Sequence, residues 1–174
     1  MFEGTGRIAC VVGAVIAVVL QIVVAPNIAL FGAMPNFLLC FAVVASIARA
    51  QSCGLAMPFV LGLLFDLLGG GPVGACALLL VVASFVASRA YLLLDNDTLF
   101  IPLALVVGSM FAVELLYGVL LMTCGLAVSP LEALVYRALP CAVYNCVFAL
   151  VMYPIAMRFL APRAPQQPSS PLVG

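Results

Sequence analysis

Residues 99–113 read LFIPLALVVGSMFAV and contain no charged side chain. The apolar residues follow one another without the period of two of a half-buried strand or the period of 3.6 of a water-facing helix. Such a run indicates a helix buried on every side, and its length approaches the roughly 20 residues that cross a bilayer. The stretch therefore predicts a membrane-spanning helix.

Similar apolar blocks lie at residues 8–20, 37–48 and 75–87. Of the 174 residues, 67% are apolar and 7% are charged, whereas soluble domains average about 25% charged residues. We therefore expect an all-α polytopic membrane protein in which residues 1–160 form one transmembrane domain. Residues 161–174, rich in proline, glutamine and serine, are expected to be a disordered cytoplasmic tail.

Prolines, glycines and polar loops divide the apolar sequence into six expected spans, which form a six-transmembrane-helix bundle. Their ranges are residues 8–24, 34–48, 52–71, 75–88, 99–123 and 131–160. The third has a short apolar core, but its full range would reach about 30 Å at 1.5 Å per residue. The sixth contains Pro140 and Pro154, which predict a kink or an interfacial first turn.

Arginine near the ends of spans is retained on the cytoplasmic side of a membrane. With six spans and cytoplasmic N- and C-termini, all arginines but Arg137 face the cytoplasm. A competing arrangement makes residues 37–68 a re-entrant hairpin and places Arg49 in lipid. That placement would cost at least about 2.5–3.5 kcal/mol, so six spans are favoured.

The composition lacks residues on which several classes of function depend. There is no histidine and no lysine, and the six arginines are scattered singly, so nucleic acid is not an expected partner. The seven cysteines form no CxxC pair, so we expect no disulfide framework, metal site or cofactor. The serines have no nearby base, so the sequence shows no catalytic constellation and an enzyme is not expected.

Two charges lie deep within apolar blocks, Glu114 in the fifth span and Arg137 in the sixth. Counted from the outer ends of their spans, their depths differ by about 5 Å, which an arginine side chain can bridge. We expect a structural intramembrane ion pair, with a proton or ion relay through Glu114 as the alternative.

A third charge, Asp66, lies directly before the turn Gly69-Gly70-Gly71-Pro72-Val73-Gly74. Its carboxylate can face the N–H groups that begin the fourth span and so lock the turn, or it can bind a partner protein. The turn also matches GxGxxG, but it follows an apolar helix rather than a strand. A nucleotide site is therefore not expected.

The sequence GLLFDLLGGGPVG at residues 62–74 resembles the central motif of the rod shape-determining protein MreD family, in which a Gly-Leu pair precedes an aspartate and a proline-glycine turn. LPCAVYN at 139–145 is similar to the proline, tyrosine and asparagine pattern of the family's last span. APN at 25–27 and MPNF at 34–37 resemble its first outer linker and its entry to span two. The positions singled out by this resemblance are Asn36, Gly62, Asp66, Pro72, Gly74, Pro140 and Asn145.

The resemblance implies a non-enzymatic scaffold of the bacterial cell-elongation complex in the inner (plasma) membrane. Such proteins bind an MreC-type bitopic partner and act with actin-like MreB, a RodA-type glycosyltransferase and a class B penicillin-binding protein in lateral peptidoglycan synthesis and cell shape.

The family is also similar to the substrate-binding components of energy-coupling-factor transporters, which have six short helices. A small-molecule-binding component of that kind is the alternative function. It would require an outward-facing pocket with several convergent polar groups, and the sequence supplies few beyond Asn27, Asn36, Asp66 and Glu114.

Overall fold

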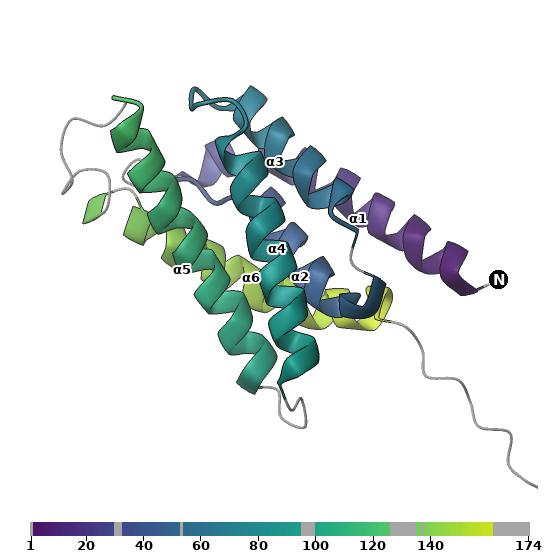
Figure 1. Ribbon diagram of the computed structural model, residues 1–174. Helices are drawn as coiled ribbons and strands as arrows, with labels where there is room; N and C mark the ends of the chain where they lie inside the picture. Colours follow the sequence, from purple (N-terminus) through teal and green to yellow (C-terminus); the bar gives the residue numbers. More distant parts are fainter. Residues whose placement is uncertain are drawn as a thin grey trace, which may run out of the picture.

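Every regular element that the computed structural model describes is a helix. The description covers residues 2–29, 33–52, 54–94, 100–125, 135–136 and 138–161, with residues 2–5 as backbone alone. The α-helices are α1 Phe2–Val23, α2 Phe37–Ala48, α3 Ala56–Leu68, α4 Ala75–Leu93, α5 Phe100–Thr123 and α6 Leu139–Leu160, with 3-10 turns η1 Ala25–Ile28 and η2 Ala50–Ser52. The expected all-α class is confirmed (Figure 1).

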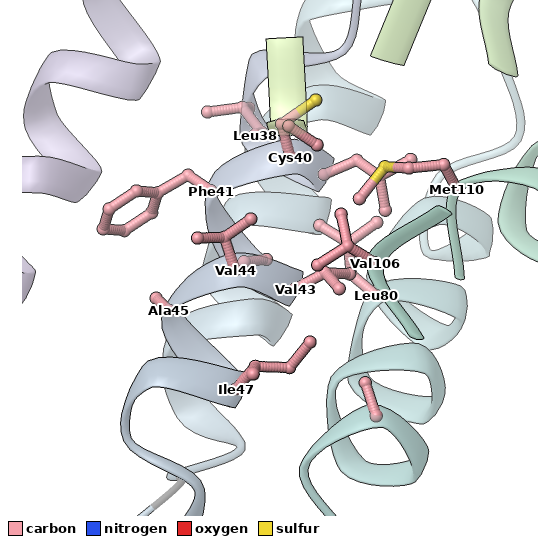
Figure 2. Packing of buried hydrophobic residues seen from close by; sticks show 14 of the residues in the cluster. Leu38, Cys40, Phe41, Val43, Val44, Ala45, Ile47, Leu80, Val106 and Met110 are labelled. Carbon is pink, nitrogen blue, oxygen red and sulfur yellow. The ribbon is translucent and has the colours of Figure 1, made fainter. Parts of the chain in front are cut away.

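Helix α2 forms the centre of the bundle, and each of its 12 residues is buried. It packs against each of the other five α-helices, and Figure 2 shows Val43 of α2 beside Leu80 of α4 and Val106 of α5. The FLLCFAVVASIA sequence of α2 carries no charged residue, and a helix that is apolar all round lies in a protein core or in a membrane.

The outer surface of the bundle is apolar. Ile8 and Val11 of α1 are 66% and 63% exposed, and Leu67 of α3 and Phe159 of α6 are exposed to similar extents. In water such a surface would promote aggregation, whereas against lipid tails it needs no cover. The chain is therefore built as a membrane protein, with its most continuous apolar packing around α2.

Among the described residues, four helices are long and apolar enough to cross a membrane. They are Gly6–Val23 within α1, Ala75–Leu93, Phe100–Thr123 and Leu139–Leu160. The expected third span is shorter than its sequence range suggested: α3 has 13 residues, which gives about 20 Å rather than 30 Å at 1.5 Å per residue. Helix α2, with 12 residues, is shorter still, so the six-span arrangement stays a prediction.

Two further boundaries differ from those expected. Helix α4 continues past Arg89 and ends at Leu93, whereas its span was expected to end at residue 88. The Arg89 guanidinium lies 5.4 Å from the centroid of the Phe85 ring. This cation–π contact stabilises the charge within the helix. Pro140 lies in the first turn of α6, where a missing N–H removes no helical bond. The expected tail and the segment 126–134 lie outside the described residues, apart from Ala161.

Successive helices run in opposite directions, so alternate ends meet at each side of the bundle (Figure 1). The start of α1 lies at the same end as the last turns of α2 and α6. At that end, the Arg49 guanidinium lies against Gly6, where an added Cβ would be 3.5 Å from it.

The backbones of helices α3 and α4 approach each other closely at Gly62. A Cβ built on Gly62 would lie 2.4 Å from Cα of Ala77 and 2.8 Å from the carbonyl oxygen of Cys76. Any side chain at Gly62 would therefore push α3 away from α4. Small residues permit this approach, which is the usual basis of tight packing between membrane helices.

Replacing Gly62 by alanine is expected to destabilise the bundle by about 1–3 kcal/mol, because the added methyl group overlaps backbone atoms that cannot move aside. Thermal unfolding of the purified protein in detergent measures the effect. Gly70→Ala is the matched control, since nothing lies within 4 Å of a Cβ at Gly70. Equal melting temperatures for the two variants would contradict the close contact.

Candidate functional site

Asp66 binds the N-terminus of α4. Its carboxylate accepts hydrogen bonds from the backbone N–H groups of Gly74 (2.8 Å), Cys76 (3.1 Å) and Ala77 (3.2 Å), and the side chain is 2% exposed. The first N–H groups of a helix have no intrahelical acceptors and carry the positive end of its dipole. Of the two roles considered for Asp66, the structure shows the one that locks the turn.

Gly71 and Gly74 of the turn cannot carry a side chain, each for a different steric reason. Gly74 has φ +95°, in the left-handed region, and forms the N-cap of α4, a conformation that a side chain would strain. A Cβ on Gly71 would lie 2.1 Å from the hydroxyl oxygen of Tyr117 on α5. The Tyr117 ring also meets the Phe65 ring edge to face, with centroids 6.4 Å apart. The GxGxxG pattern therefore serves a helix-to-helix connection.

Three side chains cap the buried start of α2: one from α6, one from α1 and that of the N-cap residue itself. Asn145 of α6 accepts from the Asn36 N–H through Oδ1 at 2.6 Å, and Gln21 of α1 accepts from the Phe37 N–H at 2.8 Å. Asn36 itself accepts from the Leu39 N–H at 2.9 Å. Because these N–H groups are buried and have no acceptor within the helix, each side chain replaces a bond that α2 cannot make for itself.

Asn145 also connects this cap to the intramembrane carboxylate. Its Nδ2 donates to Oε1 of Glu114 at 2.6 Å, and its backbone oxygen accepts from the Cys40 thiol at 3.3 Å. Asn145 is completely buried and uses its amide as both donor and acceptor. Arg137 lies outside the described residues, so its pairing with Glu114 stays a prediction.

The structure brings the motif residues into two neighbouring clusters. Gly62, Asp66, Pro72 and Gly74 gather at the α3–α4 connection, and Asn36, Asn145 and Glu114 gather at the start of α2. Pro140 begins α6 and makes no side-chain hydrogen bond, because proline has none to make.

Two further residues complete this network, and sequence reasoning missed the first of them. Gln21 holds the α2 cap from both sides, since its Nε2 also donates to the Pro35 carbonyl oxygen at 3.3 Å. Tyr144 donates to the Ile28 carbonyl oxygen at 3.1 Å, and so ties α6 to the linker after α1. The available signal was that Gln21 is an amide inside an otherwise apolar span.

A cavity of about 530 Å³ lies between the two clusters. Its polar boundary includes Gln21, Asn36, Glu114 and Tyr117, and the backbone of Gly69, Gly70 and Gly71 forms one wall. Apolar side chains such as Ile22, Met34, Leu68 and Leu121 complete it. Within the described part of the chain, no three His, Cys, Asp or Glu side chains are placed to hold a metal ion.

Replacing Asn145 by leucine is expected to lower the free energy of unfolding by about 1–3 kcal/mol, because the buried Asn36 N–H loses its acceptor. Thermal unfolding in detergent measures the change. Asn27→Leu is the matched control, since Asn27 is exposed and its side chain bonds to the Val23 carbonyl one turn away. A loss as small as that of the control would show that the Asn145 bonds do not support the fold.

A family model described as rod shape-determining protein MreD matches residues 6–162. No curated protein and no solved structure matches. The match covers nearly the whole chain and confirms the resemblance carried by residues 62–74 and 139–145, so the chain belongs to the rod shape-determining protein MreD family.

Proposed function

We propose that this chain is a non-enzymatic membrane scaffold of the bacterial cell-elongation complex. In this role it lies in the plasma membrane, crosses it several times with both termini in the cytoplasm, and binds an MreC-type bitopic partner. Through that partner it supports lateral peptidoglycan synthesis by a RodA-type glycosyltransferase and a class B penicillin-binding protein. Membership of a rod shape-determining family is the basis of the proposal.

The observation that carries the proposal is the use of the buried polar groups. Gln21, Asn36, Asp66 and Asn145 are all buried and all bind the chain's own backbone. Within the described residues, the Ser84 hydroxyl alone among buried side-chain nitrogen and oxygen atoms has no hydrogen-bond partner. Because these polar side chains bind the ends of helices, they support a rigid framework whose surfaces can contact other proteins.

The arginines support this orientation. Arg7, Arg49 and Arg158 lie on helix ends at one side of the bundle, near the start of α1, and arginines near span ends favour the cytoplasmic side. The α3–α4 turn and the start of α2 then face outward. A bitopic partner would meet both clusters there, beside its own juxtamembrane segment.

Co-expression with the MreC-type protein of the same organism tests the scaffold. After solubilisation in mild detergent, the two chains are expected to elute together in size-exclusion chromatography, because a scaffold forms a lasting complex with its partner. An unrelated bitopic protein expressed at the same level is the control. Complete separation from a monodisperse bundle would refute the proposal, and co-elution with a transporter ATPase module instead would favour the alternative function.

A further inference from the structure

Among the described α-helices, α3 is the shortest one that has an exposed apolar face. Its 13 residues make it about 20 Å long at 1.5 Å per residue, whereas α5 and α6, with 24 and 22 residues, are about 36 Å and 33 Å long. Helix α2 is shorter, but it is buried at every position. Helix α3 instead lies on the outside of the bundle, packed against α4 and α2 (Figure 1).

The outward face of α3 carries large apolar side chains. Phe59 and Val60 are 49% and 51% exposed, and Leu67 in the last turn is 64% exposed. Tight contacts between membrane helices use small side chains, and Gly62 of α3 is already used in this way against α4. The large outward side chains therefore favour lipid tails, rather than another helix, as the neighbours of this face.

Both ends of α3 expose groups that hydrocarbon cannot satisfy. At the start, the N-cap residue Leu55 forms no side-chain hydrogen bond with the helix, and Gln51 and Ser52 shortly before it are exposed. At the other end, Gly70 is exposed, and no described residue accepts a hydrogen bond from its N–H group. Because backbone groups cannot be left unsatisfied in hydrocarbon, both ends must reach water or lipid headgroups.

The distance between these two ends is too short for an ordinary bilayer. A hydrocarbon core is about 30 Å thick, and any tilt of α3 would shorten its reach across the membrane further. Lysine, arginine, tryptophan and tyrosine can anchor a short span at the interface, but residues 51–74 contain none of them. Two ways to accommodate α3 remain: a thinner bilayer beside it, or a second chain that covers it.

We propose that the bilayer is thinned along the outward face of α3, and that this face preferentially binds phospholipids with short acyl chains. The inference rests on the topology proposed above, in which η2 lies on the cytoplasmic side and the glycine turn on the outer side. The longer helices α5 and α6 face lipid of ordinary thickness. Lipid binding at α3 requires no partner protein, so it is tested separately from the scaffold.

Competition between lipids beside a single tryptophan tests this face. The chain has no tryptophan, so Val60→Trp places a reporter on α3 and Val147→Trp places the matched reporter on α6, at positions that are 51% and 56% exposed. Each variant is reconstituted alone in bilayers of dibrominated dioleoyl phosphatidylcholine, whose bromine atoms quench the fluorescence of nearby tryptophan. Unbrominated dimyristoleoyl or dierucoyl phosphatidylcholine, with shorter or longer chains, then competes for the lipid sites beside the reporter.

At Val60→Trp, the relative binding constant of the short-chain lipid should exceed that of the long-chain lipid by at least about twofold, because long chains must deform to match α3. At Val147→Trp, the long-chain lipid should compete at least as well as the short-chain lipid, because α6 is about 33 Å long. Phe59→Trp lies on the same face of α3 and replaces Val60→Trp as the reporter if that variant does not fold.

Two results would overturn the proposal. The first is the same ratio of binding constants on α3 and on α6, which would show that the lipid beside α3 is no thinner than elsewhere. The second is an absence of quenching at the α3 reporter in every lipid mixture, because a second copy of the chain would then cover the face.

Discussion

A backbone N–H group buried inside a protein must find an acceptor, and the central helix of this bundle begins with N–H groups that are buried. Helix α2 is buried at all 12 positions, and its first N–H groups are bonded by Asn145, Gln21 and Asn36. These bonds join α6 and α1 to the centre of the bundle. The surrounding helices can pack around α2 only because its start is satisfied in this way.

The same constraint is met a second time at α4, by a carboxylate instead of amides. Asp66 bonds three N–H groups across the glycine turn, and Gly62 brings α3 close enough to make those bonds possible. The two capped helix ends border one cavity, with Glu114 joined to the first of them through Asn145. The residues that hold the fold together are therefore the residues that shape the candidate site.

Sequence reasoning could predict the helical class, the family and the capping role open to Asp66, because each depends on local pattern. It overestimated the length of α3, because the length of an apolar stretch does not show where the helix begins and ends. The first and last residues assigned to this span belong to η2 and to the Gly69-to-Gly74 turn instead. Asn36 and Asn145 were singled out by resemblance, but their bond joins residues 109 positions apart. No periodicity indicates such a bond. Gln21 was missed for the same reason, since one amide in an apolar run does not name its partner.

Hydrogen–deuterium exchange in detergent, resolved to single amides, tests the central claim most directly. If the side-chain caps hold the start of α2, the amides of Asn36, Phe37 and Leu39 should exchange as slowly as those in the middle of α2, although they belong to a helix end. Exchange of these three amides as rapid as that of Gly70 in the turn would contradict the account, because the start of α2 would then open easily although the bundle stays folded.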